Sequence, residues 1–450
     1  MFQNLVDNSY KITFYVVIFY FLAMIVVGGI SARRSSGILG FFLAGRSIRA
    51  VMLTATLSAT IVGASSTLGM AGMGFQEGLT GAWWMLSGTI GLCLLAFAFA
   101  EKVRATGCYT LPELVGTQYD ERVRTAASLL IVVSWTGVIA AQIIASGKLL
   151  STLFSGSPAL FMAISALVFI LYTAGGGQNS IVKTDMVQFL ILLAGIMLLS
   201  ARVFDTAGCE LLRDQSFPLS PARGAFDVIS LVAVVGSMYI VGPDIYSRLL
   251  SAQDPATAKR STIIAALILI PLAFIITALG ICAQALCPGI SPEQALPVLM
   301  IELLSPLEVG VLAAALLSAL MSSADTTLLT SATIFTLDIY KRARPKSEEA
   351  HLMKISRVSI LLIGSLALIV SLYSPGIIAT LLAAYTLFAG GMIVPVIAGF
   401  FREQLGLTSE GALAALLGGG GTAVIFGQKY PLLGMAVSAV LLVVVSRGTR

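Results

Sequence analysis

Residues 57–75 read LSATIVGASSTLGMAGMGF, and this run decides the fold class of the chain. It is apolar enough to enter a membrane, but glycines and hydroxyl residues interrupt it along its whole length. In a bilayer such residues free backbone groups that lipid cannot hydrogen-bond. A second interrupted run, VVGSMYIVGPDIYSR at residues 234–248, contains Gly236, Gly242 and Pro243. The two runs together predict a buried site built from irregular backbone.

The composition around these runs is that of a membrane protein. Hydrophobic residues make up 57% of the 450 residues and charged residues only 11%, whereas soluble domains carry about 25% charged residues. Apolar runs of about 20 residues, long enough to cross about 30 Å of hydrocarbon, recur along the chain. We therefore predict an all-α polytopic membrane protein with about 13 transmembrane helices, at residues 12–31, 51–75, 81–100, 126–155, 158–176, 183–203, 225–245, 261–285, 306–336, 355–374, 376–400, 411–427 and 431–446.

The distribution of basic residues predicts the orientation in the membrane. With the N-terminus outside and the C-terminus in the cytoplasm, the inner loops hold most of the 27 Lys and Arg residues, as cytoplasmic loops should. We therefore expect the plasma membrane, here a bacterial inner membrane, and we explain the net charge of +5 by orientation and not by nucleic-acid binding. The outer side keeps only Lys11, Lys148, Arg202, Arg213, Arg223 and Lys429.

Several other features narrow the class of protein. The first apolar run has no cleavage site after it, so we expect it to stay as a helix and not to be removed as a signal peptide. A single His351 leaves no residue for a Ser/His/Asp triad or a zinc site. Cys209 and Cys287 both fall in predicted outer loops, where they form a disulfide or remain unpaired small hydrophobic residues.

The two interrupted runs lie five spans apart, at matching positions in two five-helix halves. That placement indicates an inverted-repeat secondary transporter, in which the substrate binds at mid-membrane where the breaks meet. The alternative is that the glycines form small-residue faces for helix packing. No long soluble segment interrupts the helices, so we expect residues 1–450 to form one membrane domain.

A face of oxygen-bearing residues marks the ninth predicted span. Ala319, Ser322, Ser323 and Thr326 are three or four residues apart and therefore lie on one side of a helix. Sodium is a hard cation that binds several oxygens, and broken-helix carbonyls supply further ligands. The alternative for the two serines is back-bonding to the carbonyl four residues earlier.

Four motifs together resemble the sodium/solute symporter family, over roughly residues 40–400. They are similar to motifs of the sodium/galactose, sodium/proline and sodium/sialic acid transporters. The motif that contains Ser322 and Ser323 is the most specific of the four. The motifs are LSATIVGASSTLGMAG, YTAGGGQNSIVKTDMVQ from Tyr172, GPDIYSRLLSA from Gly242, and LMSSADTTLLTSATIFTLDIYKR.

The resemblance implies the leucine-transporter-type fold, with a leading helix at 12–31, inverted five-helix repeats at 51–203 and 225–400, and two C-terminal helices at 411–446. It also implies sodium-coupled uptake of a small organic solute, without an obligate protein partner. When the alignment is anchored on the glycine-rich run and SATIFTLDIYK, the family's shared sodium site falls on the carbonyls of Ala59, Val62 and Ala319 and the hydroxyls of Ser322 and Ser323.

Some members of the family have a second sodium site, which the resemblance places here on Asp185, Asp325 and Thr326, with Ser322 shared. Asp325 stands where sialic acid transporters have a hydroxyl, so it binds a second sodium, carries a proton or pairs with a cationic solute. A buried carboxylate is costly and is usually paired or functional.

Each aspartate also has a structural alternative. Asp325 could be a protonated carboxyl bonded to Thr327 or Thr330. Asp185 lies near the inner boundary beside Lys183, where a surface ion pair or a helix-start cap would explain it.

The resemblance also suggests residues that contact the solute. Ser65 and Ser66 replace the Glu and Gln that bind sugar in galactose-type members, so a sugar is disfavoured. The aromatic residues could instead belong to the interfacial belt or the core, and Asp244 could pair with Arg248. The suggested residues are Ser65, Ser66, Trp83, Trp84, Tyr239, Asp244 and Tyr385.

Three other classes remain as alternatives to a sodium symporter. One is a proton-coupled symporter of the same fold. Another is an intramembrane aspartyl protease that uses Asp185 and Asp325, but their contexts, KTDMV and SADTT, lack the GxGD pattern. The third is a sensor or channel, which would show no ion-coupled transport. We expect a transporter and not an enzyme.

Overall fold

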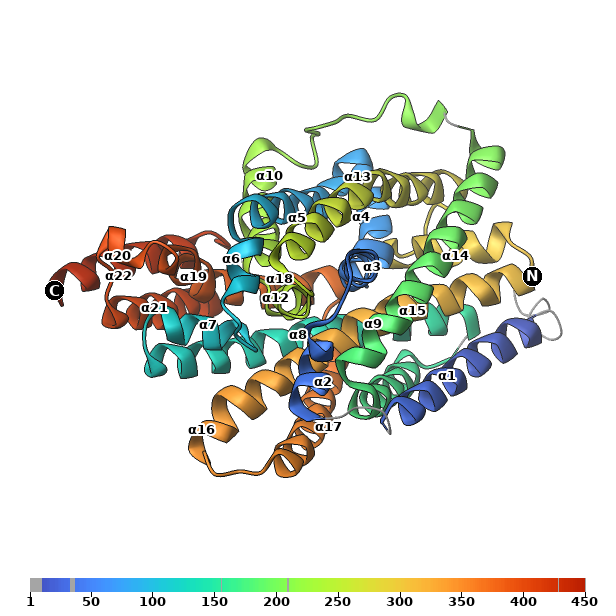
Figure 1. Ribbon diagram of the computed structural model, residues 1–450. Coiled ribbons are helices and arrows are strands. Elements are labelled where there is room, and N and C mark those ends of the chain that lie inside the picture. The colour runs from blue at the N-terminus through green and yellow to red at the C-terminus, as the bar shows by residue number, and fades with distance from the viewer. Residues whose placement is uncertain (1–9, 33–36, 155, 209, 428, 450) are drawn as a thin grey trace.

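The computed structural model describes residues 10–32, 37–154, 156–208, 210–427 and 429–449. Most of these residues are helical, and ten helical segments among them are long and apolar enough to cross a membrane. Large apolar side chains such as Phe19, Phe97 and Ile425 are more than two-thirds exposed on the outer surface, as expected of helices that face lipid. The chain is therefore an all-helical, multi-pass membrane protein (Figure 1).

The helices divide into long and short elements. The long ones are α1 (Tyr10–Ala32), α8 (Glu121–Phe154), α9 (Pro158–Ala207), α13 (Pro255–Leu286), α15 (Pro306–Ile334), α17 (Glu349–Tyr373), α21 (Ser409–Phe426) and α22 (Leu433–Gly448). The short ones are α2 (Gly37–Leu43), α3 (Ala50–Ile61), α4 (Met70–Glu77), α5 (Trp83–Leu94), α6 (Ala100–Ala105), α7 (Leu111–Gln118), α10 (Ala225–Leu231), α11 (Ser237–Val241), α12 (Pro243–Leu250), α14 (Ala295–Leu303), α16 (Lys341–Ala343), α18 (Ile377–Phe388), α19 (Val394–Gly399) and α20 (Arg402–Leu405).

Both interrupted runs are broken helices, as the sequence predicts. Between α3 and a π-helical turn that leads into α4, Val62 leaves the helical region, with φ −84° and ψ 69°. Between α11 and α12, Gly242 is extended, with φ −59° and ψ 126°. The packing interpretation also applies, at the far end of the first run, because a Cβ on Gly74 would lie 2.2 Å from the carbonyl oxygen of Thr277. Broken backbone and close helix packing therefore occupy different parts of one segment.

The predicted spans 158–176 and 183–203 join into the single element α9. Its helix is kinked at Gly177, whose φ of +62° is one that residues with a Cβ rarely adopt. Thr173 precedes the kink and Asp185 follows it. Both residues form hydrogen bonds with side chains of α15, so the kink lies between two contacts with that helix.

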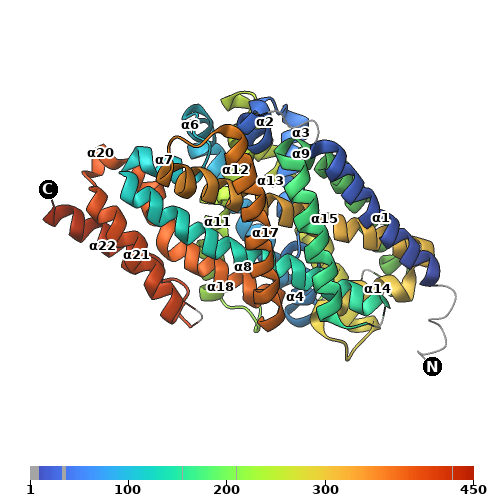
Figure 2. The same cartoon turned by 90° about the horizontal axis from the view of Figure 1, so that it is seen from below.

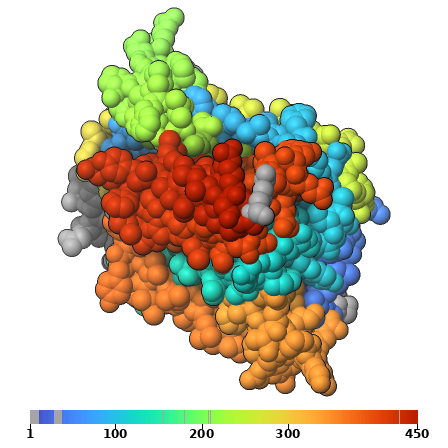
Figure 3. All heavy atoms as spheres, turned by 90° about the vertical axis from the view of Figure 1, so that its left-hand side faces the viewer, coloured from blue at the N-terminus to red at the C-terminus, as the bar shows by residue number. Residues whose placement is uncertain are grey.

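The helices pack side by side around α15, which contacts α1, α8, α9 and α17. In Figures 1 and 2, α1 lies at one end of the molecule, and α21 and α22 lie at the other end, next to α19. The C-terminal helices cover one outer face in Figure 3. Elements α3, α8, α12, α15 and α18 meet in the interior, where the candidate site lies.

Candidate functional site

The break after α3 leaves two backbone carbonyls without partners in the part of the chain that the structure describes. Hydroxyl groups bond the carbonyl oxygens of Thr60, Ile61 and Gly63, with donors from Ser323 at 2.8 Å, Ser66 at 2.8 Å and Thr67 at 2.7 Å. Within the described residues, no hydrogen bond reaches the carbonyl oxygens of Ala59 and Val62. Buried carbonyls are nearly always paired, so these two are available to a ligand. They are the carbonyls that the family resemblance assigns to sodium.

The serine pair of α15 faces this break. Ser322 Oγ donates to Asp185 Oδ1 at 2.6 Å, and Ser323 Oγ donates to the carbonyl of Thr60 at 2.8 Å. Neither serine bonds back to its own helix, so the back-bonding alternative is wrong for both. Their hydroxyl oxygens keep lone pairs that can still bind a cation. Ala319 lies one turn earlier on α15 and is also buried.

Gly63 allows α3 and α15 to approach this closely. A Cβ there would lie 2.4 Å from Ser323 Oγ and 2.9 Å from Gln142 Oε1. Gln142 of α8 in turn accepts a hydrogen bond from the backbone N–H of Ala64 at 2.8 Å. Any larger side chain at this position would separate the broken segment from the serine pair.

Asp185 is fully buried at the meeting point of three helices. It accepts hydrogen bonds from Thr56 of α3 and Ser322 of α15, and it forms an ion pair with Arg248 of α12, with Nη2 to Oδ2 at 3.2 Å. The surface alternative for Asp185, an ion pair or cap near Lys183, is therefore wrong. The side chain is completely buried, although its sequence position beside Lys183 suggested the inner boundary.

Arg248 lies at the predicted second cation site. Its Nη2 donates to Thr326 and, at 3.2 Å, to Asp185. The predicted pairing of Arg248 with Asp244 is absent from the described ion pairs, so that interpretation is wrong. The Nε and Nη1 atoms of Arg248 are buried, and within the described residues they have no hydrogen-bond partner. A protein cation thus contacts two of the three residues that the resemblance assigns to a second sodium.

Asp325 is buried on α15, the helix that carries the serine pair, but its hydrogen-bond partner lies on another helix. Thr173 of α9 donates to Asp325 Oδ1 at 2.7 Å. The expected partners Thr327 and Thr330 do not serve this role, since Thr327 bonds back to the carbonyls of Ser323 and Ala324. Asp325 therefore connects α15 to α9 just before the kink at Gly177.

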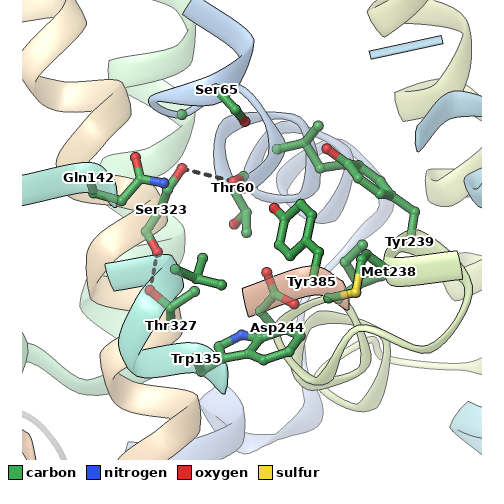
Figure 4. Close-up of a pocket in the computed structure, with 14 residues that line it drawn as sticks. Thr60, Ser65, Trp135, Gln142, Met238, Tyr239, Asp244, Ser323, Thr327 and Tyr385 are labelled. Carbon is green, nitrogen blue, oxygen red and sulfur yellow. Dashed lines mark hydrogen bonds between the residues drawn. The ribbon is translucent and has the colours of Figure 1, made fainter. Parts of the chain in front are cut away.

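A small cavity lies beside the serine pair (Figure 4). Its volume is about 40 Å³, room for only a few water molecules, so a solute can enter only if the walls move apart. The lining comes from α3 and the following break, α8, the second broken helix, α15 and α18: Thr60, Ile61, Gly63, Ser65, Trp135, Val138, Gln142, Met238, Tyr239, Asp244, Ile245, Ser323, Thr327 and Tyr385.

The predicted solute contacts separate into two groups. Ser65, Tyr239, Asp244 and Tyr385 line the cavity together. Ser66, Trp83 and Trp84 do not: Ser66 bonds to the carbonyl of Ile61 at 2.8 Å. Trp83 donates to the carbonyl of Pro218 at 2.7 Å and stacks on Phe217. Trp84 is fully buried and stacks on Tyr385, with ring centroids 6.3 Å apart, so it supports the cavity wall from behind.

Sequence reasoning missed several residues of the site. Gln142 was the most detectable, because it is a lone amide in the apolar run 126–155. Thr56 and Thr60 are four residues apart on α3. Thr56 donates a hydrogen bond to Asp185, and the hydroxyl of Thr60 bonds to that of Thr326 on α15. Trp135 carried no signal that separates a cavity wall from ordinary core. Cys287 is a free cysteine, and its proposed disulfide partner Cys209 lies outside the described residues.

Sequence comparisons match most of the chain to known transporters. A family model described as the sodium:solute symporter family matches residues 41–419. The sodium/pantothenate symporter of Escherichia coli strain K12 is 29% identical over 426 residues, which cover 88% of this chain and 87% of that protein. The sodium/proline symporter of Staphylococcus aureus strain JH9 is 24% identical over 483 residues, which cover 99% and 94%.

Comparison with solved structures shows a shared fold. A substrate-bound, outward-open Na+-coupled sialic acid symporter superposes with a TM-score of 0.82 at 18% identity, covering 97% of this chain and 98% of that chain. A nucleobase-cation-symport-1 family transporter in a closed conformation gives a TM-score of 0.55 at 14% identity, covering 92% and 93%. At these identities the likeness concerns the fold.

Proposed function

Because the chain belongs to the sodium:solute symporter family, we propose that it imports a small organic solute together with sodium by alternating access. The family is one of transporters and not of enzymes, and sodium is a co-substrate in it and not a resident cofactor. The sodium-coupled relatives have names that specify small solutes, pantothenate and proline among them. Ion and solute are expected to raise each other's affinity by the same factor, since binding coupling is reciprocal.

One observation carries the proposal: the carbonyls of Ala59 and Val62, which accept no hydrogen bond within the described residues, lie at the end of α3, where Ser323 of α15 bonds the carbonyl of Thr60. We assign the sodium site to these carbonyls, the carbonyl of Ala319 and the hydroxyls of Ser322 and Ser323. The set contains no carboxylate, so a monovalent cation bound by neutral oxygens suits it better than a divalent one. Its neighbour is the cavity lined by Ser65, Tyr239, Asp244 and Tyr385, which we assign to the solute.

A second cation position is proposed at Asp185, Asp325 and Thr326. In the structure Arg248 contacts Asp185 and Thr326 there, so a second sodium binds only after the guanidinium moves away. The alternative function is proton-coupled symport, and the buried carboxyl of Asp325 is the observation that favours it. The two alternatives differ in the coupling ion: solute uptake is driven by an imposed sodium gradient in the first and by an imposed proton gradient in the second.

The finer architecture is part of the same proposal. About 13 transmembrane helices would form a leading helix at 12–31, inverted repeats at 51–203 and 225–400, and two helices at 411–446. The broken segments at Val62 and Gly242 support it, because each begins one of the proposed repeats. The proposed location is a bacterial inner membrane, with the N-terminus outside and the C-terminus in the cytoplasm.

The test is the thermal stability of purified protein in sodium against potassium, followed by uptake in proteoliposomes with an imposed sodium gradient. Wild type should be stabilised by sodium, and Ser322→Ala and Ser323→Ala should each weaken that response. Ser331→Ala is the matched control, because Ser331 is buried on the same helix and its hydroxyl has no hydrogen-bond partner among the described residues. Identical behaviour of wild type in the two ions would overturn the proposal.

A further inference from the structure

The cavity carries one formal charge. Among its lining residues only Asp244 is ionisable at neutral pH, and no Lys or Arg accompanies it. Arg248, one turn further along α12, is engaged with Asp185, and no ion pair of Asp244 is found in the described part of the chain. Asp244 lies in the first turn of α12, where the helix N-terminus favours a carboxylate. Among the described residues, the cavity therefore presents a carboxylate that has no ion-pair partner.

Aromatic side chains line the same cavity as this carboxylate. Figure 4 shows Asp244, Tyr385 and Trp135 on the same side of the cavity, with Tyr239 on the adjoining wall. Trp135 is 2% exposed, and within the described residues its Nε1 has no hydrogen-bond partner. The ring of Tyr385 is held in place by stacking on Trp84. Aromatic faces next to a carboxylate are the surroundings in which proteins bind ammonium groups.

We propose that the solute carries a positively charged nitrogen, which Asp244 binds by charge while Tyr239, Tyr385 and Trp135 enclose it. This inference rests on the proposed function and specifies the solute that the same cavity takes. An organic anion without a positive group would face the Asp244 carboxylate with no basic side chain to offset the repulsion. A neutral sugar would leave the carboxylate without a counter-ion in a closed cavity.

The proposed solute site is also next to the proposed sodium site. Thr60, Gly63 and Ser323 line the cavity and belong to the break and serine pair that would bind sodium. Asp244 reaches the cavity from the second broken helix, so the two cations would bind to separate oxygen groups. The arrangement lets both positive charges bind without sharing a carboxylate.

The test compares pairs of solutes that differ in one atom and in charge. Choline is compared with its neutral isostere in which carbon replaces nitrogen, glycine betaine with the corresponding carbon isostere, and L-proline with cyclopentanecarboxylate. Pantothenate and glucose serve as solutes without a positive nitrogen. The readouts are thermal stability in sodium and in potassium, and dissociation constants by calorimetry on the full chain in nanodiscs.

We expect at least one positively charged member to bind about tenfold or more tightly than its isostere, in sodium only. Asp244→Asn keeps the shape of the side chain and should abolish that preference, while Asp244→Glu should retain part of it. Asp205→Asn is the control for loss of a carboxylate, since Asp205 is exposed near the end of α9. If sodium without any solute still stabilises Asp244→Asn, the variant is folded.

The remaining outcomes separate the two proposals. If sodium stabilises the protein but only pantothenate, glucose or the isosteres bind, the inference about the charged nitrogen is overturned and sodium coupling stands. A sodium response with no response to any positively charged member also overturns the inference. If sodium and potassium act identically with every solute, the proposed function itself fails.

Discussion

Arg248 and Asp185 form an ion pair in which both side chains are almost completely removed from solvent, with 3.2 Å between Nη2 and Oδ2. Arg248 comes from α12, the second half of the second broken helix, and Asp185 comes from α9, on the C-terminal side of the kink at Gly177. The pair therefore links two segments that lie in different proposed repeats. It also places a protein cation at the proposed second sodium position, where the two cations would compete for the same oxygens.

Removing the guanidinium should make the second position available to sodium. For Arg248→Gln we expect the Hill coefficient for sodium to rise from about 1 toward about 2, because the number of sites limits the coefficient. The measurement is sodium-dependent stabilisation over a concentration series at constant ionic strength. Arg260→Gln, an exposed change on α13, is the control. An unchanged coefficient in a folded Arg248→Gln protein would show that Arg248 does not exclude sodium.

The same ion pair predicts a pattern of stabilities. Asp185→Asn and Arg248→Gln should each lower the free energy of unfolding by about 3–5 kcal/mol, because each leaves a buried charge without its partner. The double variant should be more stable than the sum of the two losses predicts. Denaturant unfolding in detergent measures the three variants together. Simple additivity would contradict the coupling of the two residues.

Asp325 distinguishes sodium binding from proton coupling. Its carboxylate accepts a hydrogen bond from Thr173 at 2.7 Å, and asparagine at this position keeps one acceptor while removing the charge. In the Arg248→Gln background, where the second position is open to sodium, we expect Asp325→Asn to weaken sodium binding there roughly tenfold, which corresponds to about 1.4 kcal/mol, and to leave the pH dependence of uptake unchanged. Thr173→Val is the companion variant, which removes the hydrogen bond without removing the charge. Loss of pH dependence with an unaltered sodium curve would instead identify Asp325 as a proton carrier.

Gly63 should be intolerant of any side chain. In Gly63→Ala the new Cβ would lie 2.4 Å from Ser323 Oγ, so α15 or the broken segment must move. We expect sodium-dependent stabilisation and uptake to fall together. Gly421→Ala is the control, because nothing lies within 4 Å of a Cβ at that position. A sodium response of Gly63→Ala equal to that of wild type would remove the serine pair from the proposed sodium site.

The proposed orientation can be tested at two exposed loop positions. In a background without native cysteines, Asp214→Cys should react with an impermeant thiol reagent on intact cells, because the segment between α9 and α10 is predicted to lie outside. Lys346→Cys, in the segment between α16 and α17, should react only after the membrane is permeabilised. The reverse pattern would invert the topology.

The sequence alone was enough to predict the membrane environment, the broken helices and the oxygen-rich face of α15. These features depend on local properties, since apolar length determines which segments enter lipid and glycine or proline determines where a membrane helix is interrupted. The residues Ser322, Ser323, Ala59 and Val62 could be assigned because they lie in motifs that resemble those of a known family. Spacing along one helix placed the two serines on a common face, whereas Ala59 and Val62 came only from the resemblance, and their role in a sodium site stays a prediction.

Only the tertiary structure decided which buried charges meet. Asp244 lies four residues before Arg248, a spacing that predicts an ion pair, yet Arg248 pairs with Asp185, which is 63 residues away along the chain. Asp325 likewise bonds to Thr173 and not to a residue of its own helix. Helix periodicity predicts neighbours within one helix, but it does not predict which side chains of different helices meet. Partners in different helices therefore depend on the packing of the whole domain, and that packing left Asp244 free to face the cavity.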